Sequence, residues 1–363
     1  MLATQILDPT PTGIAEAARL LREGNLVAIP TETVYGLAGD ITNLHAISQI
    51  FASKERPTFD PLIVHISLNQ KGSFLTYLEE DLQLVNLSDF SASTRQKIDH
   101  LLHCFWPGPL TIVLPKTSRV ADLVTSGLGD VALRIPKHPI TQAVLQASQT
   151  PLAAPSANRF GRISPTSAQA VLAELAGRIP CILDGGSCQV GLESTVIRID
   201  LQGIPWLLRP GGLASEQIAA VWGEPLHLPN SEASQGSPGR LTSHYAPQKP
   251  LLLLPKPLAH FTENDWQIWR EKLDPYPHLG VLRFVQPGDA VLDLADPWRK
   301  PVTVSLLSGV EDLPAAARGL FASLRTLDES PAHIIVSEPS PSMNGLGHAI
   351  ADRLQRAAVK RMI

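Results

Sequence analysis

The chain contains few cysteines, and they are not spaced as metal ligands. Cys104, Cys181 and Cys188 are the only three in 363 residues, and no two of them form a CxxC pair. An odd and sparse count argues against a disulfide framework and against a structural zinc site. Positions in the core or near the surface explain these residues better than a nucleophilic role does.

Long apolar runs and an excess of positive charge are also absent. No uninterrupted apolar run reaches about 18 residues, so we predict no transmembrane helix. Residues 1–8 lack the basic stretch and apolar core of a secretory signal. The formal net charge is −4, whereas proteins that wrap nucleic acid usually carry a basic excess. We therefore expect a cytosolic protein that makes no use of a membrane and is no nonspecific nucleic-acid scaffold. A local basic pocket stays compatible with this charge.

Several signatures of common enzyme classes are missing as well. The sequence has no GxxxxGK[ST] loop, no GxGxxG after a predicted strand, no GxSxG and no HExxH. The sequence therefore gives no support for a P-loop nucleoside triphosphatase, a serine hydrolase or a zinc protease.

The first two-thirds of the chain alternate between strand-like and helical patterns. The spacing is too irregular for a regular βαβ series, so we predict an α/β fold with a twisted, mixed sheet. The predicted strands are 26–29, 62–66, 110–114, 131–135, 181–183 and 195–199, and the predicted helices are 14–22, 44–52, 139–147 and 166–175.

A change of composition separates a second, smaller domain. Residues 230–240 are rich in Ser, Pro, Gly and Gln, which is typical of a linker. We therefore predict a first domain over 1–213, a linker over 214–249 and a three-layer α/β domain over 250–363. Within the last domain the predicted strands are 251–254, 280–284 and 333–337, and the predicted helices are 313–327 and 349–362.

Polar clusters follow several predicted strands, where α/β proteins usually place ligands. The first is the turn that contains Thr31, at the end of strand 26–29. Its hydroxyls can orient a polar small molecule, or they can cap the turn locally. Near the end of strand 62–66 stands His65, a residue that alone is usually structural.

Two cations end the helix predicted at 44–52. Lys54 and Arg56 can contact a polyphosphate, but cations are also favoured at a helix C-terminus by the helix dipole. Asp60 follows them, and the residues alone assign it no role.

A third cluster follows the apolar residues 152–154. Ser156 and Asn158 alternate there, and Ser164 stands where we predict the helix 166–175 to start. Free N–H groups at a helix start attract anions, although an ordinary N-cap is an equally simple explanation. Farther along, Ser194 begins the strand 195–199 and can face a ligand, and Arg209 leaves an apolar run.

Arg134 is the most informative single residue. It lies inside the apolar strand 131–135, where an unpaired guanidinium is costly. It therefore has either a carboxylate partner in the protein or an anionic ligand, and the residues alone do not decide between them.

Together these segments resemble the threonylcarbamoyl-AMP synthases of the Sua5/YrdC type. The GLGHAIADRLQRAA segment at 345–358 is similar to the extra domain of the longer Sua5 form, which the short YrdC form lacks. The motifs that carry the resemblance are PTETVYGL at 30–37, KERPTFDPLIVHI at 54–66, WPGPLTIVL at 106–114, VALRIPKHP at 131–139, AAPSAN at 153–158, DGG and GLESTV within 184–196, LLRPGG at 207–212 and SPGRLTSHYAP at 237–247.

The resemblance implies a twisted mixed sheet around a basic cavity and a role for each matching residue. Lys54 and Arg56 would act as the catalytic cations, and Tyr245 would fold over the nucleotide as part of a linker lid. The implied ATP contacts are Lys54, Arg56, Ser156, Asn158, Ser164, Arg209 and Tyr245. The implied threonine contacts are Thr31, His65, Arg134, Ser194 and the backbone near Ala154.

The resemblance also implies a reaction. L-threonine, bicarbonate and ATP would give threonylcarbamoyl-AMP and pyrophosphate, with Mg²⁺ accompanying ATP and no metal site on the protein itself. A downstream transferase would then modify adenosine 37 of tRNA.

Two other functions compete with this interpretation. The first is a hydrogenase-maturing carbamoyltransferase, which would need zinc-finger segments that this chain lacks. The second is a noncatalytic module that binds double-stranded RNA, and the net charge of −4 argues against it.

Overall fold

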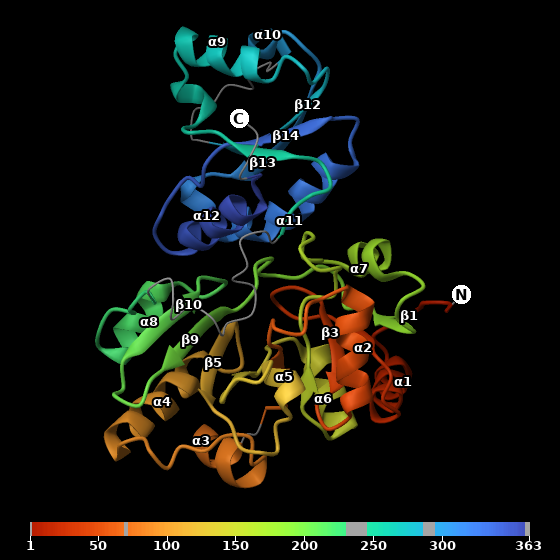
Figure 1. The fold of residues 1–363 in the computed structure, drawn as a ribbon, viewed down its shortest axis with the longest axis vertical. Helices are drawn as coiled ribbons and strands as arrows, with labels where there is room; N and C mark the ends of the chain where they lie inside the picture. Colours follow the sequence, from red (N-terminus) through yellow and green to blue (C-terminus); the bar gives the residue numbers. More distant parts are fainter. Residues whose placement is uncertain (1, 69–71, 230–244, 286–294, 360–363) are drawn as a thin grey trace. The chain divides into compact units, whose positions relative to one another are not determined.

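The structure is a computed structural model that describes residues 2–68, 72–229, 245–285 and 295–359 (Figure 1). It divides into two compact units. The N-terminal unit comprises Met1–Phe160 and Ser164–Arg240, and the C-terminal unit comprises Gly161–Ile163 and Leu241–Ile363. Along the described residues, no helix combines the length and the apolar character that crossing a membrane requires.

The N-terminal unit is built on a ten-stranded mixed sheet, with strand order β1-β8-β2-β3-β7-β4-β6-β5-β9-β10. Parallel pairs such as β4 with β6 stand beside antiparallel pairs such as β5 with β6, which confirms the predicted fold class. The strands are β1 (Gln5–Leu7), β2 (Val27–Ile29), β3 (Gly36–Asp40), β4 (Ile63–His65), β5 (Leu110–Pro115), β6 (Asp130–Arg134), β7 (Leu152–Ala153), β8 (Cys181–Leu183), β9 (Thr195–Ile199) and β10 (Pro205–Arg209).

Local sequence signals set where the helices of this unit begin and end. Thr10 caps α1 by accepting a hydrogen bond from the Gly13 amide, and a proline begins the helix. Helix α2 ends because Glu55 adopts a left-handed conformation with φ of 54°. The helical segments are α1 (Pro11–Arg22), α2 (Leu44–Lys54), α3 (Phe74–Thr76), the π-helix η1 (Tyr77–Asp81), α4 (Ala92–Phe105), α5 (Asp122–Thr125), α6 (Pro139–Ser148), α7 (Ala168–Leu175) and α8 (Ser215–Trp222).

One predicted helix boundary is wrong in a way that affects the site. Helix α7 begins at Ala168, and its N-cap is Ser167, which accepts from the Ala170 amide. Ser164 therefore does not stand at the start of a helix, and the argument that free helix N–H groups surround it fails. Helix α8 falls inside the range 214–249 that we predicted as linker, and it buries Ile218 and Trp222 in the core of the N-terminal unit.

The C-terminal unit contains a four-stranded parallel sheet with strand order β11-β14-β12-β13, which agrees with the small α/β domain that we predicted. Three of these strands match the predicted ones, whereas β13 was not predicted. The last helix is Leu346–Ala357, so the predicted helix 349–362 begins too late, and residues 360–362 lie outside the described part. The elements are β11 (Leu251–Leu253), η2 (Leu258–His260), α9 (Glu263–Lys272), β12 (Leu279–Val285), α10 (Ala295–Trp298), β13 (Val302–Ser308), η3 (Val310–Asp312), α11 (Leu313–Glu329), β14 (Ile334–Ser337) and α12 (Leu346–Ala357).

Each unit has its own apolar core. Leu133 of β6 and Ile112 of β5 are fully buried in the N-terminal unit, and Val281 of β12 is fully buried in the C-terminal unit. Burying such a side chain contributes about 1.5–3 kcal/mol. Cys181 and Cys188 are unpaired and buried, and burial raises the pKa of each thiol to about 12. Both thiols are therefore poor nucleophiles, as the sequence predicted.

Candidate functional site

Arg134 lies at the end of β6 in the interior of the sheet, and only 3% of it is exposed. Its Nε donates to the Gly108 carbonyl at 3.2 Å, and one terminal nitrogen donates to Thr33 Oγ1 at 2.9 Å. The other donates to Glu32 Oε1 at 2.6 Å, which forms an ion pair. Of the two partners left open by the sequence, the structure shows the protein carboxylate. This pairing is what makes a buried guanidinium tolerable.

The turn after β2 places that carboxylate. Thr31 Oγ1 donates to the Val34 carbonyl at 2.6 Å and lies 2.8 Å from Thr33 Oγ1. Glu32 is held at its second oxygen by the Lys137 amide at 3.0 Å. The hydroxyls therefore do cap the turn locally, and in doing so they fix Glu32 beneath Arg134.

His65 stands beside Arg134, because the two residues are register partners on the parallel strands β4 and β6. Its ring is buried, and burial first, then the charge of Arg134, lowers the pKa of His65 to about 3. The imidazole is thus neutral at physiological pH. It can offer a hydrogen bond to a ligand but no positive charge.

Lys54 is the last residue of α2 and only 1% of it is exposed. Its Nζ donates to the carbonyls of Ser156 at 2.5 Å and Asn158 at 2.6 Å. Burial, and then the nearby Arg56, hold the pKa of Lys54 well below its usual value. The structure therefore brings together the Lys54 motif and the Ser156–Asn158 motif, which are about a hundred residues apart in the sequence. An anion bound beside the Lys54 amine would favour its protonated, charged form.

Arg56 is held by contacts with the residues that follow it in the chain. Its Nε donates to the Asp60 carbonyl at 3.1 Å, and a terminal nitrogen donates to the Pro61 carbonyl at 2.9 Å. The same nitrogen lies 2.9 Å from Asp60 Oδ2, and both side chains are buried. Asp60, to which the sequence assigned no role, is thus an ion-pair partner that orients Arg56.

A third cluster joins β9 and β10. Arg209, the last residue of β10, donates to the Ser194 carbonyl at 2.9 Å and to Ser194 Oγ at 3.2 Å. Ser194 Oγ also lies 2.7 Å from Thr111 Oγ1. The chain after Arg209 passes so close to β9 that a Cβ on Gly211 would lie 2.3 Å from the Glu193 carbonyl oxygen. Only glycine fits there, which explains the glycine after Arg209-Pro210.

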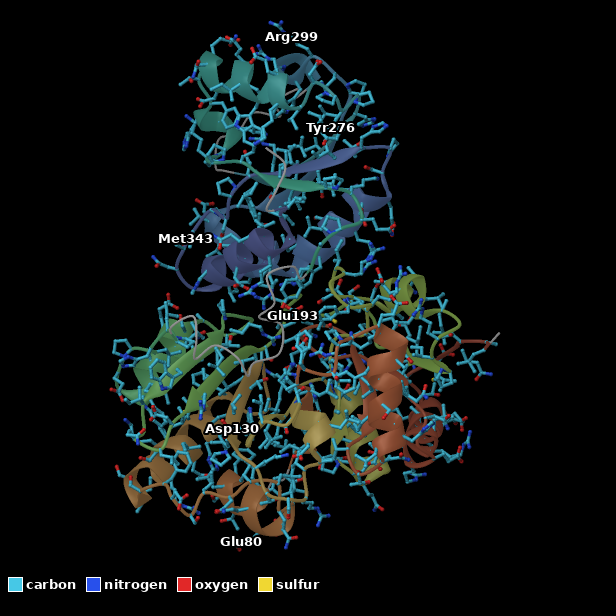
Figure 2. All side chains as sticks on the ribbon, viewed as in Figure 1. Glu80, Asp130, Glu193, Tyr276, Arg299 and Met343 are labelled. Atoms are coloured by element: carbon cyan, nitrogen blue, oxygen red, sulfur yellow. The ribbon has the colours of Figure 1, made fainter. Side chains whose placement is uncertain are left out.

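Ser164 joins this cluster through a neighbouring acid. Its Oγ donates to Glu193 Oε1 at 2.5 Å, and both side chains are buried (Figure 2 labels Glu193). Ala154 directly follows β7, and its amide donates at 3.0 Å to the carbonyl of Ile63 in β4, the strand that carries His65. Hydrogen bonds thus link several predicted site residues of the N-terminal unit in three groups, around Arg134, Lys54 and Arg209. Arg56 bonds instead to the residues that follow it, and His65 and Ala154 bond to Ile63.

Tyr245 is the predicted site residue that the structure places elsewhere, in the C-terminal unit. Its ring is 1% exposed, stacks on Phe321 with centroids 5.6 Å apart, and lies 4.8 Å from the guanidinium carbon of Arg353. Its contact with a nucleotide stays a prediction.

Sequence reasoning missed several residues that complete the site. Glu32 and Thr33 stand in a motif that we quoted, but their pairing with Arg134 has no periodic signal. Tyr35 is another, because its hydroxyl donates to the Gly186 carbonyl at 2.8 Å and accepts from the Gly185 amide at 3.0 Å. Burial raises the pKa of Tyr35, so it stays a neutral phenol that holds the glycine turn.

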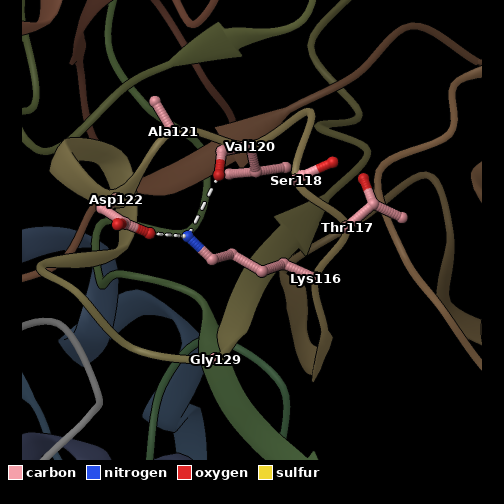
Figure 3. Close-up of a pocket in the computed structure, with 7 residues that line it drawn as sticks. All are labelled: Lys116, Thr117, Ser118, Val120, Ala121, Asp122 and Gly129. Carbon is pink, nitrogen blue, oxygen red and sulfur yellow. Dashed lines mark hydrogen bonds and ion pairs between the residues drawn. The ribbon is translucent and has the colours of Figure 1, made fainter.

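A surface pocket of about 450 Å³ lies apart from these groups, between β5 and α5 (Figure 3). Its lysine, Lys116, donates to Asp122 Oδ1 at 2.6 Å and to the Val120 carbonyl at 3.0 Å. No predicted site residue lines it. The pocket therefore lies apart from the candidate site that the buried cations form.

Comparison with known proteins matches both parts of the chain to family models. Residues 19–211 match the model described as telomere recombination, and residues 213–359 match the C-terminal domain of threonylcarbamoyl-AMP synthase. A threonylcarbamoyl-AMP synthase of Bacillus subtilis is 38% identical over 99% of this chain and 97% of its own length. One of Pyrococcus abyssi is 37% identical over 96% of this chain and 94% of its own length.

Solved structures give the same result. The crystal structure of Pyrococcus abyssi Sua5 complexed with L-threonine superposes with a TM-score of 0.81, at 34% identity, and 98% of each chain is covered. A buried set of cations in a mixed sheet, followed by a small parallel α/β domain, defines a class of two-domain α/β proteins. The chain belongs to the threonylcarbamoyl-AMP synthase family.

We predict that Glu32→Gln destabilises the fold strongly, because it leaves the Arg134 guanidinium buried without a counter-charge. Removing one partner of a buried ion pair costs about 3–5 kcal/mol, so a loss of about 3 kcal/mol in the free energy of unfolding is expected. Urea denaturation measures it. Glu16→Gln, which breaks an exposed pair with Arg19, is the matched control and should leave the midpoint unchanged. Equal midpoints for both variants would contradict the assignment.

We also predict a specific pH dependence from His65. Its folded-state pKa of about 3 lies below its ordinary value of 6.5, so only the unfolded chain takes up this proton between those values. The stability that it contributes is complete above about pH 6.5 and is lost as the pH falls towards 3, at about 1.4 kcal/mol per pH unit. In urea denaturation, wild type should therefore lose about 2 kcal/mol more than His65→Asn between pH 7.5 and pH 5. Parallel pH profiles would contradict it.

Proposed function

We propose that this chain condenses L-threonine, bicarbonate and ATP into threonylcarbamoyl-AMP and pyrophosphate. The observation that carries the proposal is the set of buried cations, Lys54, Arg56, Arg134 and Arg209, in a chain whose full length matches synthases of that name. Such a set of cations is suited to bind a polyanionic substrate together with the carboxylate of an amino acid.

The proposed reaction has two bond-forming steps. The amine of threonine attacks the carbon of bicarbonate, and loss of water leaves an N-carboxylate, the carbamate. A carbamate oxygen then attacks the α-phosphorus of ATP, the bond to the bridging oxygen breaks, and pyrophosphate leaves. This is a nucleotidyl transfer without a covalent enzyme intermediate, so the protein contributes positioning and charge stabilisation.

On the phosphate side, Lys54 and Arg56 are the proposed catalytic cations. Lys54 Nζ is held between the carbonyls of Ser156 and Asn158, so its position is set before a ligand arrives. Negative charge on the attacked phosphate would raise the lowered pKa of Lys54 and so favour the ammonium form. Asn158, Ser164 and Arg209 are proposed to complete the ATP contacts together with Ser156.

On the amino-acid side, Arg134 is proposed to bind the carboxylate of threonine. An arginine has five N–H donors, and Arg134 uses three of them on Gly108, Thr33 and Glu32 within the described residues. Two donors are left for a ligand, which lets one guanidinium serve a structural ion pair and a substrate. Thr31, His65, Ser194 and the backbone near Ala154 are proposed to surround the rest of the amino acid. The L-threonine complex of the Pyrococcus abyssi protein supports L-threonine as the amino acid that is bound.

Magnesium is proposed to enter with ATP. The described residues contain no group of three His, Cys, Asp or Glu side chains arranged to hold a metal ion. Mg²⁺ is commonly bound through substrate phosphates with one or two carboxylates, and the acids near the cations, Asp60 and Glu193, are already hydrogen-bonded or ion-paired. We therefore treat MgATP as the substrate. The ion would neutralise phosphate charge as pyrophosphate leaves.

The product has a proposed use outside this chain. A mixed anhydride is an acyl donor, and a tRNA transferase that modifies adenosine 37 is its proposed consumer. The proposed location of the reaction is the cytoplasm. Because water destroys the anhydride, we propose that Tyr245 and the linker close over the nucleotide. The noncatalytic RNA-binding reading gains no support from the comparisons, since the full-length relatives are synthases by name.

The decisive prediction concerns which substrates release pyrophosphate. Purified full-length protein with MgATP should release pyrophosphate only when L-threonine and bicarbonate are both present, and mass spectrometry should detect the adenylate. Omitting either co-substrate is the internal control. Pyrophosphate release that ignores threonine, or RNA binding without any turnover, would contradict the proposed function.

A second prediction concerns selectivity. L-serine keeps the hydroxyl and lacks one methyl group, and a pocket gains only about 1–3 kcal/mol from such a group. We therefore expect serine to be a substrate with kcat/KM lower by about 10–200-fold. Competition between the two amino acids in the pyrophosphate assay measures the ratio. Equal kcat/KM values would show that the site does not contact the methyl group.

A further inference from the structure

A short segment of the catalytic part of the chain belongs to the C-terminal unit. Gly161–Ile163 groups with Leu241–Ile363, whereas the residues on both sides, Phe160 and Ser164, belong to the N-terminal unit. Gly161 adopts φ of 78°, a conformation that favours glycine, where this segment begins. The three residues lie between two proposed ATP contacts, Asn158 and Ser164, so their path fixes how the chain runs from one to the other.

Two sets of contacts within the C-terminal unit hold this segment. The Ala246 amide donates to the Gly161 carbonyl at 2.8 Å, and Arg162 forms a parallel bridge with Ala246. On the other side, Arg325 of α11 donates from a terminal nitrogen to the Ile163 carbonyl at 3.1 Å. That carbonyl belongs to the residue directly before Ser164.

Helix α11 also contacts Tyr245, the residue directly before Ala246. Phe321 and Arg325 are four residues apart, so they share one face of α11. Phe321 stacks on Tyr245, while Arg325 bonds to Ile163. Arg353 of α12 covers the Tyr245 ring, so that α12 reinforces the arrangement. One helix face therefore holds both the end of the linker and the segment that leads to Ser164.

We propose that Arg325 is a positioning residue for the ATP site. By fixing the Ile163 carbonyl, it sets the backbone from Asn158 to Ser164, and it thereby contributes to nucleotide binding without itself touching the substrate. This inference rests on the proposed function for its kinetic consequence, and on the contacts above for its structural one.

Hydrogen exchange tests the structural part whether or not the enzyme turns over. In full-length protein, Arg325→Ala should speed amide exchange in the peptide 159–165 by at least about fivefold, because the segment loses a charge-assisted hydrogen bond. Arg325→Lys keeps a cationic donor and should restore most of the protection. Arg299→Ala removes an exposed arginine of the same unit and is the matched control, expected to match wild type. Unchanged exchange in Arg325→Ala would overturn the proposal.

Steady-state kinetics tests the functional part. Arg325→Ala should raise the KM for ATP by about tenfold while the KM for threonine stays within about twofold, since Arg134 and its partners lie outside the segment. Arg325→Lys should recover most of the ATP affinity. An unchanged KM for ATP, or equal increases for both substrates, would overturn the positioning role. If wild type releases no pyrophosphate but Arg325→Ala still exchanges faster, the proposed function is contradicted. The contact between Arg325 and the Ile163 carbonyl is then still supported.

Discussion

A guanidinium in the interior of a sheet is stable only when oxygen atoms surround it, and the rest of this site follows from how Arg134 meets that condition. Glu32 supplies the counter-charge at 2.6 Å, and the turn hydroxyls hold Glu32 in place. Burial, and then the charge of Arg134, lowers the pKa of the neighbouring His65 to about 3, so that ring is neutral. A single buried ion pair thus links the turn after β2 to the end of β6, beside the neutral His65 of β4.

Backbone oxygens hold two of the other buried basic side chains. Lys54 donates to the carbonyls of Ser156 and Asn158, and Arg209 donates to the Ser194 carbonyl. The positions of these side chains are therefore set by the fold, and their geometry would need little reorganisation when a polyanion binds. In the proposed site, Arg134 with its carboxylate partner would serve the amino-acid side, and Lys54 with its two carbonyl partners would serve the phosphate side.

The sequence predicted the parts of this arrangement that local chemistry encodes. Apolar runs located β5, β6, β8 and β9, whereas β3 was missed because Gly36–Asp40 contains two glycines and no β-branched residue. The motifs pointed to Lys54 and Arg134, but no periodicity could show that Glu32 pairs with a residue 102 positions away. Ser164 was assigned to a helix start because its serine and threonine neighbours all resemble N-caps, and only the hydrogen bonds identify Ser167 as the cap.

The most direct test of this account is a crystal structure of the protein with L-threonine and a non-hydrolysable ATP analogue. The account predicts the threonine carboxylate within about 2.7–3.2 Å of Arg134, with the Glu32 ion pair intact, and a phosphate oxygen at the same range from Lys54 Nζ. Threonine bound away from Arg134, or a triphosphate that contacts none of the buried cations, would contradict it.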